Sequence, residues 1–339
     1  MKPVCFLHIG THKTGTSSLQ TLLLSNEECL ERNGIFVPRS RRPLPGGGHH
    51  NLAWELSGDL RFDPASGSWP DVISEMRSRN PGTVCVSSED FEHLHLRPES
   101  LRRIKQELNS IGYEVRIVVY LRPQADYIES LYVELLKNEV YLTFREYLGK
   151  IFPRGASGPR DLWTYSFDYG EILDSFAKVF GTGCMVVRPY RANRRTKHLL
   201  NDFMSIISPE RRIRGLDFSA CRHRHNPSLS FAQVVELVLA YRGKTGEGDF
   251  EPSIPDGHFM YGRFDALDLR DLMRIRRRFG EANRVLEKEY QVKIPTMTSG
   301  RLLRELLCSA GLNRGSTRRK DLLAQLDAYH ELPRVAASG

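Results

Sequence analysis

Short apolar runs alternate with longer amphipathic stretches along the first 200 residues of the chain. Helical periodicity between these runs predicts helices near 17–32, 70–79, 98–111, 126–138 and 172–181. The runs themselves are typical of buried strands and are VCFLHI (4–9), TVCVSS (83–88), EVRIVVYLR (114–122) and CMVVRPY (184–190). This alternation predicts an α/β fold with a P-loop-like parallel sheet flanked by helices, in which the loop after the first strand binds the ligand.

The pattern changes after about residue 200, where helix-like segments follow one another without strand signals. These segments are FAQVVELVLAYRG (231–243), LRDLMRIRRRFGEANRVLEKEY (269–290) and RLLRELLCSAG (301–311). We therefore expect an α/β core over residues 1–208 and a mainly helical C-terminal part, residues 209–339, packed on that core. Between the first two helices, PRSRRPLPGGGHH (38–50) predicts an irregular, mobile connection, because it is rich in proline and glycine.

Composition narrows the class of ligand only slightly. Hydrophobic residues make up 40% of the 339 residues and charged residues 27%, which are ordinary values for a globular protein. The net charge of +8 favours anionic ligands, among them nucleic acids, nucleotides and acidic glycans. A solvated basic surface explains the same charge equally well.

The cysteines and the N-terminus bear on the compartment. The six cysteines are widely spaced and form no CxxC pair, which argues against a zinc site or a disulfide framework and favours a reducing cytosol. We see no signal peptide and no apolar stretch of the roughly 20 residues that a membrane span requires. We expect a cytoplasmic protein without an integral membrane segment.

The loop after the first predicted strand, HIGTHKTGTSSLQ (8–20), carries the first candidate chemistry. A glycine turn at a helix N-terminus offers backbone N–H groups and the positive end of the helix dipole, and Lys13 adds a charge. The loop departs from the nucleoside triphosphate pattern G-x-x-x-x-G-K-[ST], because Lys13 precedes Gly15. It suits a phosphate or sulfate, although a tight turn with a solvent-facing lysine remains the alternative.

A second candidate site follows the third predicted strand. Arg122 ends that strand, and Ser130 comes eight residues later on the next predicted helix. An arginine fork and a hydroxyl can hold a separate phosphate at the sheet edge that also carries the Lys13 loop. Taken alone, Arg122 could equally form a salt bridge at the sheet edge, and Ser130 could be an ordinary surface residue of the helix.

Together, KTGTS (13–17), Arg122 and Ser130 resemble the sulfotransferases that use 3′-phosphoadenosine 5′-phosphosulfate (PAPS). The most similar group is the bacterial HKTGT type, which is related to carbohydrate sulfotransferases, and the resemblance spans about residues 4–208. It implies that Arg122 and Ser130 bind the 3′-phosphate and that no metal is needed. The residues implied around the 5′-phosphosulfate are His12, Lys13, Thr14, Gly15, Thr16, Ser17 and Ser18, with Lys13 also catalytic.

The same resemblance implies a hydroxyl or amine acceptor, on a carbohydrate or glycolipid, and leaves the general base open. His50 follows the glycine run, where related enzymes carry a base, but adjacent histidines in such a loop are often only solvated. Glu89 ends the second predicted strand, where cytosolic members of the family place a histidine. HRHNPSLS (223–230) either lines the acceptor pocket or forms an ordinary capped helix start.

Two other functions compete with sulfonate transfer. A P-loop nucleotide or small-molecule kinase using ATP and Mg²⁺ requires a lysine after the second glycine, which is missing. A nucleic-acid binder explains the basic charge, but the basic residues show no aromatic interleaving. We therefore expect no nucleic-acid partner. The sequence determines neither the acceptor nor the oligomeric state.

Overall fold

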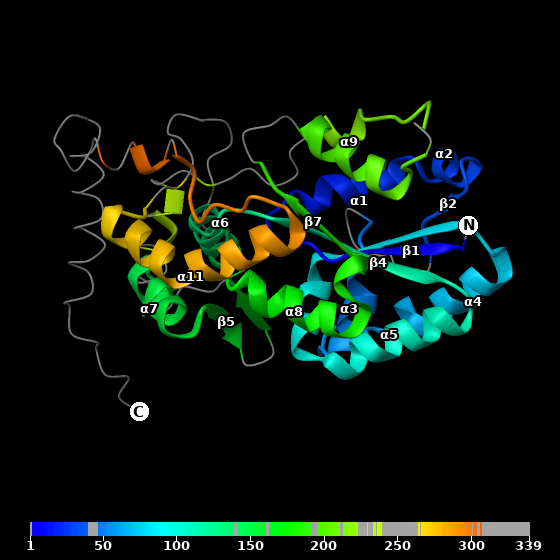
Figure 1. Ribbon diagram of the computed structural model, residues 1–339, viewed down its shortest axis with the longest axis horizontal. Coiled ribbons are helices and arrows are strands. Elements are labelled where there is room, and N and C mark those ends of the chain that lie inside the picture. Colours follow the sequence, from blue (N-terminus) through cyan, green and yellow to red (C-terminus); the bar gives the residue numbers. More distant parts are fainter. Residues whose placement is uncertain are drawn as a thin grey trace, which may run out of the picture. The chain divides into compact units, whose positions relative to one another are not determined.

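The computed structural model shows a parallel sheet flanked by helices (Figure 1). It describes residues 2–39, 47–138, 142–160, 163–191, 196–210, 213–222 and 266–299, together with 229, 233–234, 236–238, 264, 301–303 and 306. The chain divides into two compact units, which we describe separately. The first comprises residues 1–122, 160–226 and 282–294, and the second comprises 123–159, 227–281 and 295–339. The predicted division at residue 208 stays a prediction.

The first unit contains a five-stranded sheet in the order β2-β3-β1-β4-β7. All its neighbouring strands run parallel, which confirms the predicted α/β fold class. The strands are β1 (Val4–His8), β2 (Ile35–Phe36), β3 (Thr83–Ser87), β4 (Glu114–Leu121) and β7 (Met185–Pro189). The four longer strands match the four predicted apolar runs, because strands covered on both faces have near-continuous apolar sequences.

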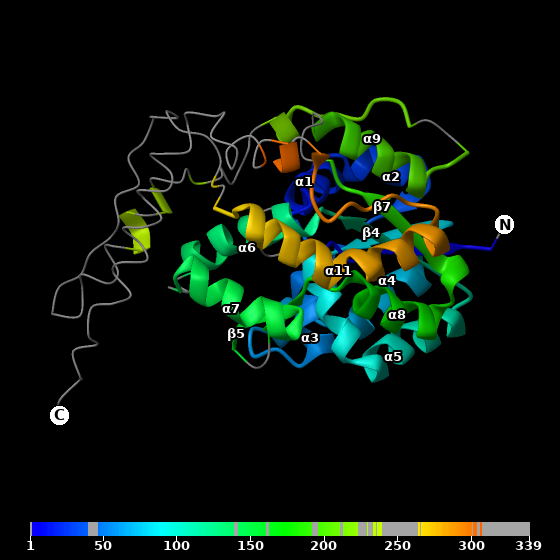
Figure 2. The same cartoon turned by 60° about the vertical axis from the view of Figure 1, so that its left-hand side comes forward.

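Helices cover both faces of this sheet. Helices α1 and α9 pack against each other on one face, and α5 and α8 on the other (Figures 1 and 2). The helices of this unit are α1 (Thr16–Ser25), α2 (Glu27–Arg32), α3 (His50–Ser57), α4 (Trp69–Arg79), α5 (Pro98–Ser110), α8 (Tyr169–Phe180) and α9 (Thr196–Ile207). Shorter elements are η1 (Pro64–Ser66), η2 (Glu89–Leu96), β6 (Trp163–Ser166), η3 (Thr182–Cys184) and η4 (Ala220–Arg222).

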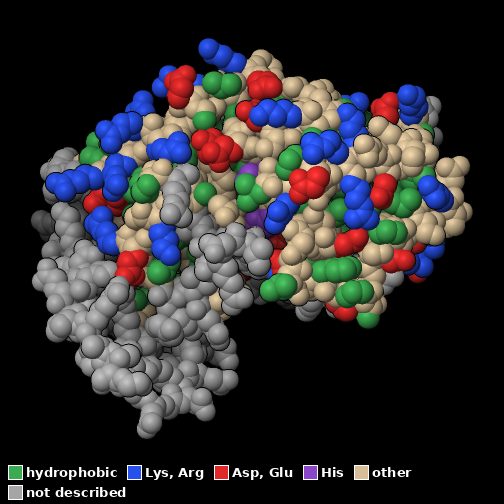
Figure 3. All heavy atoms as spheres, turned by 90° about the horizontal axis from the view of Figure 1, so that it is seen from below, with side chains coloured by type: hydrophobic (Ala, Val, Ile, Leu, Met, Phe, Trp, Pro, Cys, Tyr) green, Lys and Arg blue, Asp and Glu red, His purple; other side chains and the backbone are tan. Residues whose placement is uncertain are grey.

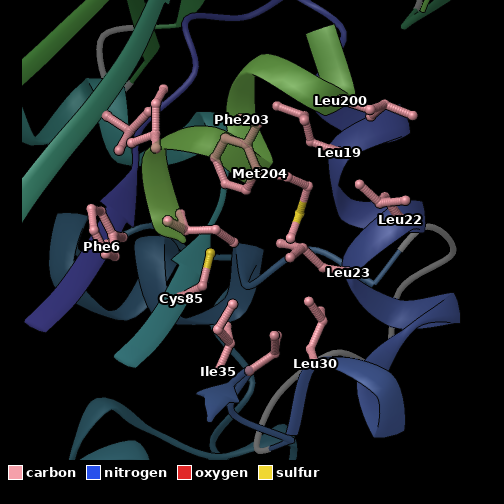
Figure 4. Close-up of a cluster of buried hydrophobic side chains, with 14 of the residues drawn as sticks. Phe6, Leu19, Leu22, Leu23, Leu30, Ile35, Cys85, Leu200, Phe203 and Met204 are labelled. Carbon is pink, nitrogen blue, oxygen red and sulfur yellow. The ribbon is translucent and has the colours of Figure 1, made fainter. Parts of the chain in front are cut away.

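One hydrophobic cluster fixes the first helix on the sheet (Figure 4). Phe6 of β1 and Cys85 of β3 face Leu19 and Leu22 of α1, and Phe203 of α9 closes the cluster. Leu19, Leu22 and Phe203 are fully buried. Burial of one such side chain stabilises the fold by roughly 1.5–3 kcal/mol, so this cluster holds the start of α1, and with it the loop before α1, against the end of β1.

The predicted helix over 17–32 is wrong in one respect, because it breaks at Asn26. The Asn26 side chain donates to the carbonyl oxygens of Leu22 (2.9 Å) and Asp217 (2.8 Å), and its own oxygen accepts from the Asp217 N–H. This tie to a distant segment replaces regular helix geometry and separates α1 from α2. The predicted irregular stretch 38–50 also ends earlier than expected, since α3 begins at His50, while residues 40–46 lie outside the described part of the chain.

The second unit contains α6 (Gln124–Lys137) and α7 (Phe144–Arg154), and the first half of α11 (Leu269–Tyr290). A short strand, β5 (Ala156–Arg160), follows α7. In this unit the buried Glu129 of α6 accepts from the two terminal guanidinium nitrogens of Arg301, at 2.8 and 2.6 Å, and from the N–H groups of Ala266 and Leu267. One carboxylate thus ties two later segments to α6.

Helix α11 confirms the predicted helix at 269–290. Of the predicted helix at 231–243 only residues 233–234 and 236–238 are described, and they are helical. Among the described residues, none of the helices combines the length and the apolar character of a membrane span.

Candidate active site

The loop between β1 and α1 turns through conformations that most residues avoid. Gly10 has φ +94° and Gly15 has φ +81°, both in the region that favours glycine. Lys13 has φ +62°, which is uncommon for a residue with a side chain and carries strain of roughly 1 kcal/mol or more. A Cβ atom on Gly10 would lie 3.1 Å from the Cα of Glu89, so glycine allows the loop to approach the end of β3 closely.

The loop is also fixed to the end of β4. Arg122, which is buried, donates from Nη1 to the carbonyl oxygen of Lys13 at 2.9 Å. The hydroxyl of Tyr169 donates to the carbonyl oxygen of Arg122 at 2.5 Å, and the guanidinium lies 5.7 Å from the ring centre of Tyr190. Lys13 and Arg122, predicted from separate motifs, are therefore held together within the first unit.

The two loops meet at the edge of the sheet where an open α/β sheet is expected to bind its ligand. The connection after β1 leads to the β2–β3 side of the sheet, whereas the connection after β4 leads to β7 on the other side. Open α/β sheets bind ligands outside the carboxyl ends of strands where the order reverses in this way. The loops of Lys13 and Arg122 flank that reversal point.

The hydroxyl groups of the loop differ in exposure. Thr14 is buried and donates from Oγ1 to the carbonyl oxygen of Thr11 at 2.5 Å, which stabilises the turn. Thr16 is buried in the first turn of α1, Ser17 is exposed and Ser18 is half-buried. The loop therefore offers the Ser17 and Ser18 hydroxyls and the N-terminal end of α1 to a ligand.

His12, the residue before Lys13, lies between two carboxylates of η2. Its Nδ1 is 2.9 Å from Oε1 of Glu92, and its Nε2 is 3.2 Å from Oδ1 of Asp90. The backbone N–H of His12 donates to the other Glu92 oxygen at 3.1 Å. Burial by itself would lower the pKa of His12, but the two carboxylates raise it well above its ordinary value of 6.5.

The two candidate bases, His50 and Glu89, lie beside the same cluster. His49, at the start of α3, accepts at Nδ1 from the Ser87 N–H at 3.1 Å and so places α3 at the end of β3. His50 then lies with Nδ1 3.0 Å from Oδ2 of Asp90 and with Nε2 3.9 Å from Oε2 of Glu89. Gln20 of α1 donates to Oε2 of Glu89 at 2.7 Å.

The charges of this cluster favour the ionised forms of His50, Glu89 and Asp90. Burial opposes the charged form of each group, but Asp90 and Glu89 together raise the pKa of His50. Burial likewise works against ionisation of the carboxyls, yet the two histidines lower the pKa of Glu89 and hold that of Asp90 well below its usual range. The attraction of opposite charges therefore outweighs desolvation and favours the ionised form of each of these groups.

His12, Glu92 and His93 have the composition of a metal-ligand set, with one potential ligand atom each within 4.8 Å of the others. Both ring nitrogens of His12, however, already face carboxylate oxygens at ion-pair distance. We therefore interpret this group as an ion-pair cluster rather than a metal centre.

The structure thus brings together His12, Lys13, Gly15, His50, Glu89 and Arg122 in the first unit. Ser130 lies half-buried on α6 in the second unit, so its pairing with Arg122 stays a prediction. His223, His225 and Asn226, the alternative acceptor residues, lie outside the described residues.

Sequence reasoning missed Asp90, Glu92 and Tyr190. The run EDFEHLH directly after β3 carried a signal for the first two, because acidic residues and histidines at the carboxyl end of a parallel strand face the ligand edge. No sequence pattern singled out Tyr190. On the face drawn in Figure 3, acidic and basic side chains are interspersed, so the net charge does not gather there into one basic field.

No family model matches the chain, and neither does any curated protein. Among solved structures, a sulfotransferase from Alicyclobacillus acidocaldarius aligns with a TM-score of 0.40 and 18% identity, over 72% of this chain and 92% of that one. The PezAT chromosomal toxin–antitoxin system of Streptococcus pneumoniae aligns with a TM-score of 0.28 and 12% identity, over 62% of this chain and 81% of that one. Because both TM-scores are below 0.5, we base no functional conclusion on either similarity.

Proposed function

We propose that the protein is a sulfotransferase that moves a sulfonate from PAPS to a hydroxyl or amine of an acceptor, with a carbohydrate or glycolipid as the expected class. The observation that carries the proposal is the contact of Arg122 with the Lys13 carbonyl oxygen at 2.9 Å. It joins two cationic loops at the crevice of the sheet. Two such cations beside a helix N-terminus suit a nucleotide with phosphate groups at two separate positions.

The loop residues divide the binding of the donor among them. Lys13, the N–H groups at the start of α1 and the hydroxyls of Ser17 and Ser18 would hold the 5′-phosphosulfate. Thr14 would contribute its backbone N–H rather than its hydroxyl, because the hydroxyl already donates within the loop. Arg122 would hold the 3′-phosphate, a group that ATP lacks.

The reaction requires a proton acceptor and charge stabilisation on the leaving group. A bond forms between the acceptor oxygen or nitrogen and sulfur, while the bond between sulfur and the 5′-phosphate oxygen breaks. Adenosine 3′,5′-bisphosphate leaves with that electron pair, and Lys13 offsets its growing negative charge. The acceptor proton must pass to a base at the same edge of the sheet.

We assign Glu89 as that base. It packs against Gly10 at the start of the loop and keeps its carboxylate ionised, because the neighbouring histidines lower its pKa. His50 is less suited to accept the proton, since its own pKa is raised and it is charged more of the time. Its role is to face the Glu89 carboxylate as a cation, with Nε2 at 3.9 Å.

Ligand-dependent melting tests the choice of nucleotide. Adenosine 3′,5′-bisphosphate without Mg²⁺ is expected to stabilise the protein by about 2.7 kcal/mol at 100 times its dissociation constant. Adenosine 5′-monophosphate, which lacks the 3′-phosphate, should stabilise it much less. A larger stabilisation by ATP with Mg²⁺ would instead support the kinase alternative and refute the sulfotransferase proposal.

Two variants separate binding from chemistry. Lys13→Ala should lower kcat for sulfonate transfer far more than it weakens bisphosphate binding, with the exposed Lys178→Ala on α8 as the matched control. Arg122→Lys should reduce the preference for the bisphosphate over the 5′-monophosphate, because a lysine cannot replace the guanidinium fork. An unchanged preference would remove Arg122 from the 3′-phosphate site.

A further inference from the structure

One carboxylate, Asp90, touches both histidines of the site. Its Oδ1 lies 3.2 Å from Nε2 of His12, and its Oδ2 lies 3.0 Å from Nδ1 of His50. The indole of Trp54 donates to Oδ2 at 2.9 Å, and the backbone N–H of Asp90 donates to the Ser88 hydroxyl at 3.1 Å. Asp90 is itself buried, so these contacts fix its orientation.

The contacts define the protonation state of His12. An ionised carboxylate can only accept hydrogen bonds, and an imidazole donates from both nitrogens only when it is charged. Because one nitrogen of His12 faces Asp90 and the other faces Glu92, the contacts favour the ring with a proton on both nitrogens. The rings of Tyr165 and His93 lie beside it, with ring centres at 5.0 and 5.3 Å. His12 is therefore a fixed cation that joins the loop of Lys13 to η2.

The same reasoning defines the tautomer of His50. Its Nδ1 lies 3.0 Å from both Oδ2 of Asp90 and the Ser88 hydroxyl. The ionised carboxylate can only accept, so it favours a proton on Nδ1 and leaves Nε2 as the nitrogen that gains or loses one. That nitrogen faces Glu89. A Cβ atom on Gly48 would lie 2.5 Å from Nε2, so the chain leaves just enough room for the ring in this orientation.

We propose that Asp90 is a positioning residue that holds His12 as an imidazolium under the phosphate loop and His50 with Nε2 turned toward Glu89. A single carboxylate thus connects the anion-binding loop to the group that faces the base. Asp90 has no contact with the reacting atoms in this scheme and acts through the two histidines. Of these two histidines, Glu92 contacts only His12.

Nitrogen-15 NMR of the histidine side chains in the full-length protein tests the proposal without any assay of activity. The signals of His12 and His50 are assigned with His12→Gln and His50→Gln. In the wild type at neutral pH, His12 should be protonated on both nitrogens, and His50 should titrate at Nε2. A neutral His12, or a His50 whose Nδ1 loses the proton, would overturn the proposal.

Substitutions then test which carboxylate controls which ring. Asp90→Asn should lower the pKa of both His12 and His50 by about one unit. This is the lower end of the shift that an adjacent opposite charge produces. Glu92→Gln should lower only that of His12, and the exposed Asp174→Asn on α8 should change neither. An unchanged His50 in Asp90→Asn contradicts the proposed role.

A reciprocal variant keeps the test valid if Asp90→Asn does not fold. His50→Gln removes one cation from Asp90 and should raise the pKa of His12, because the remaining ring has the carboxylate to itself. No change in His12 would show that Asp90 does not couple the two rings.

The kinetic readout rests on the proposed function and separates it from the histidine assignment. Asp90→Asn should lower kcat about tenfold, with KM for PAPS within about twofold, and should move the acidic limb of the pH profile to lower pH, because the negative charge of Asp90 raises the pKa of Glu89. If the NMR shifts are as expected but the wild type transfers no sulfonate, the proposed function is refuted and the role of Asp90 stands.

Discussion

Gly15, the N-cap of α1, lies where loop conformation and packing both require glycine. Its φ of +81° disfavours any residue with a Cβ, and a Cβ built there lies 2.6 Å from Cδ2 of Leu199 on α9. Gly112, between α5 and β4, offers a matched comparison. It has φ +87°, but nothing lies within 4 Å of a Cβ added at that position, so an alanine there meets the backbone penalty alone.

The two penalties can be separated by magnitude. A left-handed conformation costs an L-residue roughly 1–2 kcal/mol, which is the whole loss expected for Gly112→Ala. Gly15→Ala adds the overlap with Leu199. Overpacking typically costs about 1–3 kcal/mol, and the lower end applies because the end of a leucine side chain can move. We expect Gly15→Ala to destabilise the protein by about 1 kcal/mol more than Gly112→Ala.

Urea unfolding of the two single variants measures this difference, and a double-mutant cycle assigns its origin. Leu199→Ala removes the overlapping methyl group, so Gly15→Ala should lose less stability in that background, with a coupling of about 1 kcal/mol. The bisphosphate should also bind more weakly to Gly15→Ala than to Gly112→Ala, since only the first displaces the phosphate loop. Equal losses for the two single variants, together with zero coupling, would refute the packing argument.

Two further predictions concern buried charge. Burial lowers the pKa of His8 to about 4, although the charge of Glu89 partly offsets this, so below about 6.5 the unfolded chain takes up a proton that the folded chain does not. At 1.36 kcal/mol per pKa unit, His8 should lower the free energy of unfolding by about 3 kcal/mol between pH 6.5 and pH 4. The variant His8→Asn keeps a hydrogen-bond partner for Ser87, and its stability in urea unfolding should fall less steeply over this range. Parallel curves for the two proteins would contradict the assignment to His8. In the second unit, Arg301→Ala leaves the buried Glu129 carboxylate without its cation and should lower the free energy of unfolding by about 3–5 kcal/mol. Arg301→Lys should recover only part of this loss. A loss near zero in urea unfolding would show that the pair is not desolvated.

The sheet could be predicted from sequence because each long strand is buried on both faces. Val84, Cys85 and Val86 have no exposed surface, and such runs leave a continuous apolar signal. Strand β2 has only two residues, Ile35 and Phe36, and is too short to give one. The break at Asn26 was unpredictable for another reason: it depends on Asp217, which is 191 positions away.

The site was predictable only as far as chain topology determines it. Because all strands are parallel, the residues after β1, β3 and β4 must share one edge, and this placed Lys13, Glu89 and Arg122 together. The charge state of His12 depends on residues 78 and 80 positions away, and no local pattern contains that information. His12 was expected to contact the nucleotide directly, whereas both its nitrogens face carboxylates; that expected contact stays a prediction.

The buried cluster also bears on how the proposed base, Glu89, can lie beside the loop proposed to bind the anionic donor. Glu89, Asp90 and Glu92 are adjacent to the phosphate loop, and two unit charges about 4 Å apart interact by about 4 kcal/mol at an effective dielectric constant of 20. Three uncompensated carboxylates would therefore oppose the binding of a phosphosulfate. His12 and His50 offset two of these charges, and the bridge through Asp90 keeps both cations in place while Glu89 remains ionised. A base of this kind can then act next to a polyanionic donor, and removal of either histidine should weaken donor binding as well as change the ionisation of Glu89.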